Sequence, residues 1–195
     1  MLHTLSARRG AVTAPHHLAA QSGLAVLRDG GNAIEAAIAA AATIAVVYPH
    51  MNGLGGDGFW LIGAPGQDPV AIDACGAAGA GVDENLFRDQ GLDAVPRAGP
   101  LAACTVAGTL SGWQVALEQS AAWGGRMPLA RLLEDAIHYA GAGFALSAQI
   151  SEAIEQERAV LEGCPGFTET FLADGVPMPG SLFRNPGLAQ VLERL

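Results

Sequence analysis

Apolar and polar positions follow helical and strand periods in different parts of the chain. Leu18, Leu24 and Leu27 have mostly helical spacing, and the glycine pair at 30–31 ends this first predicted helix. Two apolar runs, FWLIGAP and PVAIDAC, flank a short turn at residues 66–68. These runs predict two neighbouring strands, and the short turn favours a hairpin.

The second predicted helix is the most apolar stretch of the chain. Asn32 can cap it, and Glu35, three residues later, completes a pattern close to a capping box. The helix then runs over residues 33–47, AIEAAIAAAATIAVV, and ends before Pro49. Because apolar residues surround it nearly completely, we expect this helix to be almost wholly inaccessible to solvent.

Further helices are predicted after a polar, glycine-rich stretch at residues 76–100, which holds one short helix at about 83–90. The longer ones cover GTLSGWQVALEQ, LARLLEDAIHYA after Pro128, AQISEAIEQERAVLEG after Ser147, and GLAQVLERL after Asn185 and Pro186. No internal repeat or linker interrupts the pattern, so we predict one partial domain over residues 1–195. The last helix shows no end signal before Leu195, and we therefore expect a chain truncated at its C-terminus, or one piece of a larger polypeptide.

The composition excludes several classes of function. Half of the residues are apolar and only 15% are charged, so part of the apolar surface is expected to meet other protein. All ten basic residues are arginine, which excludes a catalytic lysine, a Schiff base and a P-loop. The formal charge of −9 repels phosphate backbones, so no nucleic acid partner is expected. The longest uncharged apolar run, residues 36–48, is shorter than the ~20 residues of a membrane span, so no membrane partner is expected either.

The cysteines and the N-terminal residues indicate the cellular compartment of the protein. Cys75, Cys104 and Cys164 are odd in number and far apart, and they form neither a disulfide framework nor a zinc pattern. Arg8 and Arg9 form a twin-arginine pair, but no apolar segment of an export signal follows them. A cytoplasmic location is the first prediction, and a periplasmic one stays open.

A glycine motif follows the second predicted helix. Gly53, Gly55 and Gly58 satisfy G-x-G-x-x-G, but a dinucleotide site requires this motif after a strand and before a helix. The order here is the reverse, so a nucleotide is not expected. We expect instead a tight turn that needs positive φ and close backbone approach, a role also compatible with the wall of a substrate pocket.

The polar residues predict neither a metal site nor a serine hydrolase site. None of the five histidines has a partner at metal-ligand spacing; these are His3, His16, His17, His50 and His138. The adjacent side chains at positions 16 and 17 are expected to point apart. No metal is therefore expected. Ser111 precedes Gly-Trp inside a predicted helix rather than standing in G-x-S-x-G, so the sequence shows no self-contained serine hydrolase triad.

The chain resembles a known family over nearly all of its length. Residues 10–62 resemble the opening of γ-glutamyltranspeptidases, in which a helix ending in G-G-N-A leads to an alanine-rich helix, a proline and a glycine-rich loop. The similarity continues through PVAIDAC, GPLAACTVAGTLSGW and MPLARLLEDAIHYAGAGF. The variant pattern, with MNGLGGDGFW and IDACG, looks most like the branch that contains oxamate amidohydrolase.

This resemblance implies a fold and a mechanism. The fold would be α+β, the helix-rich N-terminal portion of an αββα N-terminal-nucleophile hydrolase sandwich. Such enzymes are made as inactive precursors that cut themselves into a large and a small subunit, and the new N-terminal threonine of the small subunit is the nucleophile. That threonine would lie outside this chain, so we expect no catalytic residue and no activity here. The implied partners are the small subunit, or remainder of the same precursor, and a small amide substrate, with no cofactor.

One departure from the family concerns the substrate. In transpeptidases an arginine at the end of the second strand grips the α-carboxylate of the glutamyl group, whereas the corresponding position here is Cys75. A thiol cannot replace a charged guanidinium, whose pairing with a carboxylate contributes about 2 kcal/mol or more. The resemblance therefore implies poor γ-glutamyl binding. The plainer interpretation of Cys75 is a small buried hydrophobic residue.

Two further residues complete the candidate substrate site. Arg97 is either a carboxylate-binding residue or a solvated loop arginine, and Asp57, where the family has glycine, is either a pocket residue or a turn residue. The first hypothesis is an amidohydrolase precursor that acts, when complete, on a small carboxylate-bearing amide such as oxamate. The alternatives are a γ-glutamyltranspeptidase or glutathione hydrolase, a cephalosporin-acylase-like enzyme, and an inactive structural fragment.

Overall fold

The computed structural model describes residues 6–195, so His3 lies outside the described residues. Its helices and strands divide between two compact units that interleave along the sequence. Of the described residues, the first unit contains 6–53, 113–143 and 184–195, and the second contains 54–112 and 144–183. Each unit is described by itself. The single domain predicted for residues 1–195 stays a prediction.

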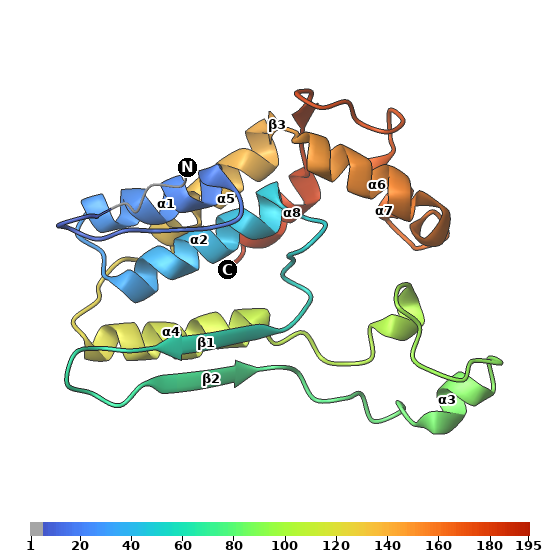
Figure 1. Cartoon of the computed structure of the whole chain (residues 1–195), viewed down its shortest axis with the longest axis horizontal. Helices are drawn as coiled ribbons and strands as arrows, with labels where there is room; N and C mark the ends of the chain where they lie inside the picture. Colours follow the sequence, from blue (N-terminus) through green and yellow to red (C-terminus); the bar gives the residue numbers. More distant parts are fainter. Residues whose placement is uncertain (1–5) are drawn as a thin grey trace. The chain divides into compact units, whose positions relative to one another are not determined.

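The first unit is helical. Its elements are α1 (His17–Arg28), α2 (Ala33–Val47), most of α4 (Thr109–Ala122), α5 (Leu129–Ala142) and α8 (Pro186–Leu192). Helices α1 and α2 lie side by side, and α2 also contacts α5 (Figure 1). At the crossing of α1 and α2, a Cβ added to Gly23 would lie 2.7 Å from the carbonyl oxygen of Ala36, so a larger residue at position 23 would separate the helices.

The predicted cap of α2 is confirmed. The Asn32 side chain accepts hydrogen bonds from the amides of Ile34 and Glu35, and the Glu35 carboxylate accepts one from the amide of Asn32 at 2.7 Å. The other carboxylate oxygen of Glu35 accepts a hydrogen bond from the amide of Met127 at 2.8 Å. The same carboxylate thus joins the start of α2 to the loop that precedes α5.

The prediction that α2 is almost wholly inaccessible is wrong along one side. Ala33 and Ala37 are exposed, and Ala40, Ala41 and Ile44 are half-buried. These positions recur every three or four residues, so they form one stripe along the helix. Helices α1 and α5 pack on α2, and beside the stripe the described residues leave a cavity of about 610 Å³. Apolar composition alone did not reveal which side the neighbours cover.

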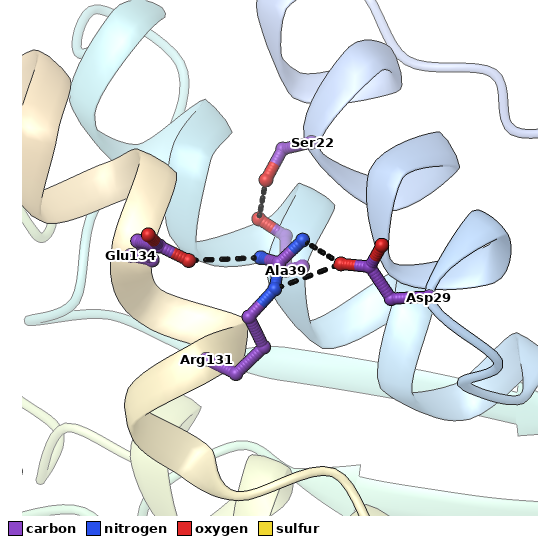
Figure 2. A network of polar contacts seen from close by, with 5 residues as sticks. All are labelled: Ser22, Asp29, Ala39, Arg131 and Glu134. Atoms are coloured by element: carbon purple, nitrogen blue, oxygen red, sulfur yellow. Dashed lines mark hydrogen bonds and ion pairs between the residues drawn. The ribbon is translucent and has the colours of Figure 1, made fainter.

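An ion-pair network fixes α5 against the end of α1 within this unit. Arg131 of α5 donates a hydrogen bond from Nε to Asp29 at 3.0 Å and makes a second, closer contact through Nη2 to the same carboxylate oxygen (Figure 2). Its Nη1 lies 3.4 Å from Glu134. The Ser22 hydroxyl donates to the carbonyl oxygen of Ala39 at 3.4 Å and adds a bond between α1 and α2.

Helix α8 begins at the predicted Asn185 cap, whose side chain accepts from the amide of Leu188. The helix ends at Leu192, and the amide of Glu193 donates to the carbonyl of Ala189. The prediction that the helical pattern continues without an end to Leu195 is therefore wrong.

The second unit contains two small antiparallel pairs and several helices. Strands β1 (Gly58–Ile62) and β2 (Val70–Ala74) form the predicted hairpin and run side by side in Figure 1. The remaining elements are α3 (Glu84–Arg88), the 3-10 turn η1 (Pro100–Ala102), β3 (Phe144–Ala145), α6 (Ala148–Leu161), α7 (Phe167–Phe171) and β4 (Leu182–Phe183). Strand β3 pairs with β4. The predicted helices that correspond to α3 and α6 are confirmed.

One face of the β1–β2 hairpin packs on the first turn of α4. A Cβ added to Gly112 would lie 2.8 Å from the Cβ of Ala74 and 3.3 Å from Nε1 of Trp60, so this contact depends on a glycine. The other face carries Phe59 and Leu61, which are 70% and 79% exposed. The hairpin therefore shows apolar surface, as the composition predicted, although the partner that would cover it stays a prediction.

Candidate functional site at the end of the hairpin

The register of the hairpin brings two of the three candidate residues together. Gly58 pairs with Ala74 as the last residues of the ladder at its open end. Asp57 precedes Gly58 and Cys75 follows Ala74, so both lie directly beyond this pair. Arg97 lies in a loop elsewhere in the same unit.

The backbone at Asp57 is fixed to the start of α4. The carbonyl oxygen of Gly56 accepts hydrogen bonds from the amides of Gly108 and Thr109, both at 3.0 Å. The Thr109 hydroxyl lies 2.8 Å from the same oxygen and 3.0 Å from the carbonyl oxygen of Asp57, so it shares its hydrogen between them. The main chain at Asp57 is therefore fixed by several hydrogen bonds from Gly108 and Thr109.

The backbone around Cys75 is fixed by direct contact between main chains. A Cβ added to Gly76 would lie 1.5 Å from the carbonyl oxygen of Val106, and one added to Gly108 would lie 1.9 Å from that of Ala74. No side chain fits between these segments. Because the contact is between main chains, it positions Cys75 without using the Cys75 side chain.

Cys75 is exposed, so its interpretation as a small buried hydrophobic residue is wrong. The Asp57 carboxylate, through its charge and through a hydrogen bond with the thiol, raises the pKa of Cys75 above its ordinary value of 9.0, and Asp73 adds to this effect. Partial desolvation acts in the same direction. The side chain is therefore a neutral thiol at neutral pH, next to two carboxylates.

Asp73 was not among the predicted site residues. Its Oδ1 accepts a hydrogen bond from the amide of Cys75 at 2.9 Å, which turns the chain as it leaves β2. An aspartate two residues before a loop position is a sequence signal for this turn, so Asp73 could have been found from the sequence. At the open end of the hairpin, Asp57 and Asp73 thus supply hydrogen-bond acceptors, and neither they nor Cys75 supplies a positive charge.

Arg97 forms a two-pronged ion pair with Glu157 of α6. Its two terminal nitrogens donate to the two carboxylate oxygens at 3.0 and 2.6 Å. These hydrogen bonds lower the pKa of Glu157 below its usual range and raise that of Arg97. Glu157 is 60 positions from Arg97, and no sequence pattern linked them. Within the described residues, the guanidinium of Arg97 is paired with Glu157, and its hydrogen bonds do not reach Asp57 or Cys75.

The glycine loop before β1 differs from its prediction. Gly53, Gly55 and Gly58 follow a helix and precede a strand, as expected, but none of them has positive φ. A Cβ added to Gly53 or Gly55 would meet nothing within 4 Å, and at Gly58 it would lie 3.4 Å from Thr109. The positive φ predicted for these glycines is therefore wrong, although the chain does turn at residues 54–55. Gly56 contributes to this loop through its carbonyl oxygen, which accepts hydrogen bonds from Gly108 and Thr109.

The described histidines differ from their predictions in how two of them lie. The rings of His16 and His17 stack with centroids 4.6 Å apart, so the expectation that they point apart is wrong. Adjacent side chains can stack here because residue 16 is the extended N-cap of α1 and residue 17 is already helical. Within residues 6–195, no group of three or more His, Cys, Asp and Glu side chains is placed to hold a metal ion. None of the helices in this part of the chain has the length and hydropathy needed to span a membrane.

Solved enzymes share the arrangement of these helices and strands. The γ-glutamyltranspeptidase of Helicobacter pylori superposes with a TM-score of 0.88 at 29% identity, over 98% of this chain and 55% of that one. The cephalosporin acylase of Bacillus halodurans superposes with a TM-score of 0.79 at 27% identity, over 99% of this chain and 38% of that one. The chain thus has the α+β fold of the corresponding part of these enzymes, as predicted.

Sequence comparison assigns the family. The γ-glutamyltranspeptidase family model matches residues 19–195, and the chain belongs to this family. It is 55% identical over 188 residues to the oxamate amidohydrolase proenzyme of Klebsiella pneumoniae, covering 95% of this chain and 35% of that protein. It is 30% identical to the glutathione hydrolase proenzyme of Escherichia coli, covering all of this chain and 34% of that protein. The chain thus spans about a third of the length of these relatives.

Proposed function

We propose that this chain is the N-terminal portion of an amide hydrolase precursor that acts, when complete, on a small carboxylate-bearing amide such as oxamate. The identity of 55% to a protein named for oxamate, against 30% to one named for glutathione, supports this substrate class. The nucleophile would be a threonine outside the chain, at the start of a small subunit cut from the same precursor. The compartment would be the cytoplasm, and no cofactor would be needed.

The observation that carries this proposal is the accessible pair of Asp57 and Cys75. Cys75 would stand where transpeptidases have the arginine that grips the carboxylate, and its exposure in this chain supports a place for it in the substrate site. The side chains around it, Asp57 and Asp73, are acceptors with negative charge. They repel a glutamyl α-carboxylate and accept hydrogen bonds from an amide nitrogen. A substrate that turns its NH₂ group towards Asp57 and Asp73 and binds its carboxylate elsewhere would avoid the repulsion and make the hydrogen bonds.

The second candidate is a γ-glutamyl or cephalosporin-type enzyme. It is favoured by the close superposition on the Helicobacter pylori transpeptidase and on the Bacillus halodurans acylase. A cation from outside this chain would then have to replace the missing arginine at Cys75. Arg97 does not meet this need while Glu157 occupies its guanidinium.

The test uses the complete precursor after self-cleavage. Ammonia release from oxamate and glutamate release from glutathione are measured for the unmodified enzyme, for Cys75→Arg and for Ala71→Arg. Ala71 is an exposed residue of the same hairpin, so its variant adds the same charge away from the pair. We expect activity on oxamate in the unmodified enzyme and in Ala71→Arg, with a loss of about tenfold or more in Cys75→Arg.

Two results would contradict the proposal. Efficient glutathione hydrolysis by the unmodified enzyme, without activity on oxamate, would show that the second candidate is correct. Equal activity of Cys75→Arg and Ala71→Arg on oxamate would place Cys75 outside the substrate site.

A further inference from the structure

A small cavity in the first unit is lined by three arginines. It has a volume of about 280 Å³ and lies between the N-terminal segment and the last turns of α1. Arg8, Arg9 and Arg28 surround it, and Leu24 and Leu27 supply apolar lining. It includes none of Asp57, Cys75 and Arg97, so it is separate from the substrate site proposed above.

The backbone explains why these arginines converge. Arg28 occupies the last turn of α1, where its charge is favourable near the carboxyl end of the helix. Gly10 has a φ of +124°, and a Cβ there would lie 3.0 Å from Cδ1 of Leu27. Because Gly10 has no side chain, the N-terminal segment passes close against α1 and brings Arg8 and Arg9 to the same cavity as Arg28.

In the part of the chain that the structure describes, no acidic side chain is paired with the three arginines. The cavity lining contains no Asp or Glu, and within residues 6–195 none of the three forms an ion pair with a carboxylate. Asp29 directly follows Arg28, but Arg131 binds its carboxylate (Figure 2). In a chain with a net charge of −9, this cavity is therefore a local concentration of uncompensated positive charge.

We propose that this cavity binds a short dicarboxylate. Guanidinium groups pair with carboxylates through two parallel hydrogen bonds, and three such groups can hold two carboxylates. Leu24 and Leu27 offer an apolar surface for the methylene groups between them. The volume of about 280 Å³ lies below the ~300–1,000 Å³ of pockets for drug-sized ligands, so the ligand is compact.

The probe for this site is succinate, with acetate and inorganic phosphate as comparisons. Acetate offers one carboxylate, and phosphate offers charge without methylene groups. Affinity is measured by titration calorimetry on the complete protein at low ionic strength, where such pairs are least screened. We expect succinate to bind more tightly than either comparison anion.

The variants are Arg28→Gln and Arg8→Gln, with Arg194→Gln as the matched control. Arg194 is an exposed arginine of the same unit that does not line the cavity. Each cavity variant should weaken succinate binding about tenfold, because it removes one charge-assisted pair, whereas the control should bind unchanged. All three positions are exposed, so the substitutions should leave the fold and the amide hydrolase activity intact.

The outcomes separate this proposal from its competitors. Absence of succinate binding at millimolar concentration, or equal affinity of the cavity variants and the control, would overturn it. Equal binding of acetate and succinate would show a site for a single carboxylate, and tighter binding of phosphate would show a site for inorganic anions; both overturn the dicarboxylate assignment. Failure of the protein to hydrolyse oxamate would leave this test unaffected, since binding is measured directly.

Discussion

The carboxylate of Glu35 accepts a hydrogen bond from the backbone amide of Met127, 92 positions later in the chain. The same side chain is 2% exposed and also closes the capping box at Asn32. Gly125 makes this arrangement possible, because a Cβ there would lie 2.0 Å from Oγ of Ser120 and 2.8 Å from Oε1 of Glu35. Asn32 completes the cluster by donating from Nδ2 to Oγ of Ser120 at 2.8 Å.

Replacing Glu35 by alanine should destabilise the protein strongly. The change leaves the half-buried backbone amides of Asn32 and Met127 without their acceptor and removes a buried side chain, so we expect the free energy of unfolding to fall by about 3 kcal/mol. Urea denaturation followed by circular dichroism measures this. Glu134→Ala is the control, since Glu134 is exposed and its contact with Arg131 should contribute less than about 1 kcal/mol. Equal effects of the two variants would contradict the assigned role of Glu35.

Replacing Gly108 by alanine should damage both folding and the candidate site. The new methyl group would occupy the space of the Ala74 carbonyl oxygen, 1.9 Å from the Cβ position, and should cost about 3 kcal/mol of stability. Gly55→Ala is the matched control, because nothing lies within 4 Å of its added Cβ. Its stability should change by less than about 1 kcal/mol. A well-folded Gly108→Ala protein with unchanged stability would show that the two main chains are not in contact.

The reactivity of the Cys75 thiol tests its pairing with Asp57. The carboxylate raises the pKa of Cys75, so little thiolate is present and alkylation by iodoacetamide at about pH 8 should be slow despite exposure. Asp57→Asn removes the charge, lowers the pKa of the thiol and should speed the reaction. Asp68→Asn, at the other end of the hairpin, should not. Mass spectrometry of the peptide that contains Cys75 gives the rates, and equal rates for both variants would remove Asp57 from the pair.

Stability should decrease in mild acid because of buried histidine. Within the described residues both ring nitrogens of His50 are buried without a hydrogen-bond partner, and burial lowers the pKa of His50 below 6.5. The unfolded chain then binds a proton that the folded chain does not, so the free energy of unfolding falls as pH drops below about 6.5. His16 acts in the same direction, through burial first and the neighbouring His17 second.

The variant His50→Phe separates this effect from general acid sensitivity. It keeps a ring against Tyr48, whose centroid lies 4.1 Å from that of His50, and it removes the proton-binding group. Its free energy of unfolding should therefore depend less on pH between about 7 and 5 than that of the unmodified protein. His138→Phe, at an exposed position, should keep the original dependence. The prediction fails where His50→Phe and His138→Phe respond to pH alike.

The 195-residue chain by itself should hydrolyse no amide. Family resemblance places the nucleophilic threonine and the oxyanion hole outside it. Purified chain is assayed with oxamate and with glutathione beside the complete, self-cleaved protein. If the chain still hydrolyses an amide after further purification, the nucleophile and the oxyanion hole have been assigned to the wrong part of the protein.

Local signals in the sequence predicted most of the elements. The Asn32–Glu35 cap, the hairpin turn and the start of α8 at Asn185 depend on residues within a few positions of one another, so their spacing was sufficient. The open stripe of α2 could not be predicted in this way. Which side of an apolar helix is covered depends on where α1 and α5 pack, and composition does not contain that information.

The candidate site was predictable in part for the same reason. Asp57 and Cys75 were singled out by comparison with the family pattern, and the hairpin predicted from the two apolar runs brings them together beyond its two strands. The pairing of Arg97 with Glu157 joins a loop to a helix 60 positions away. That contact depends on tertiary packing, and the sequence left Arg97 with two interpretations that spacing could not separate.

The contact of Gly76 and Gly108 with neighbouring main chains has a consequence for how this enzyme family can be re-engineered. The end of the hairpin is positioned by main-chain contacts and by the side chains of Thr109 and Asp73, so the side chains at positions 57 and 75 can vary without moving it. A directed-evolution library restricted to these two positions of the proposed substrate site is therefore expected to change the surroundings of the substrate on a constant scaffold. Mutations at 76 and 108 would mostly be lost to misfolding, so a position that can vary, Cys75, stands directly beside one that cannot, Gly76.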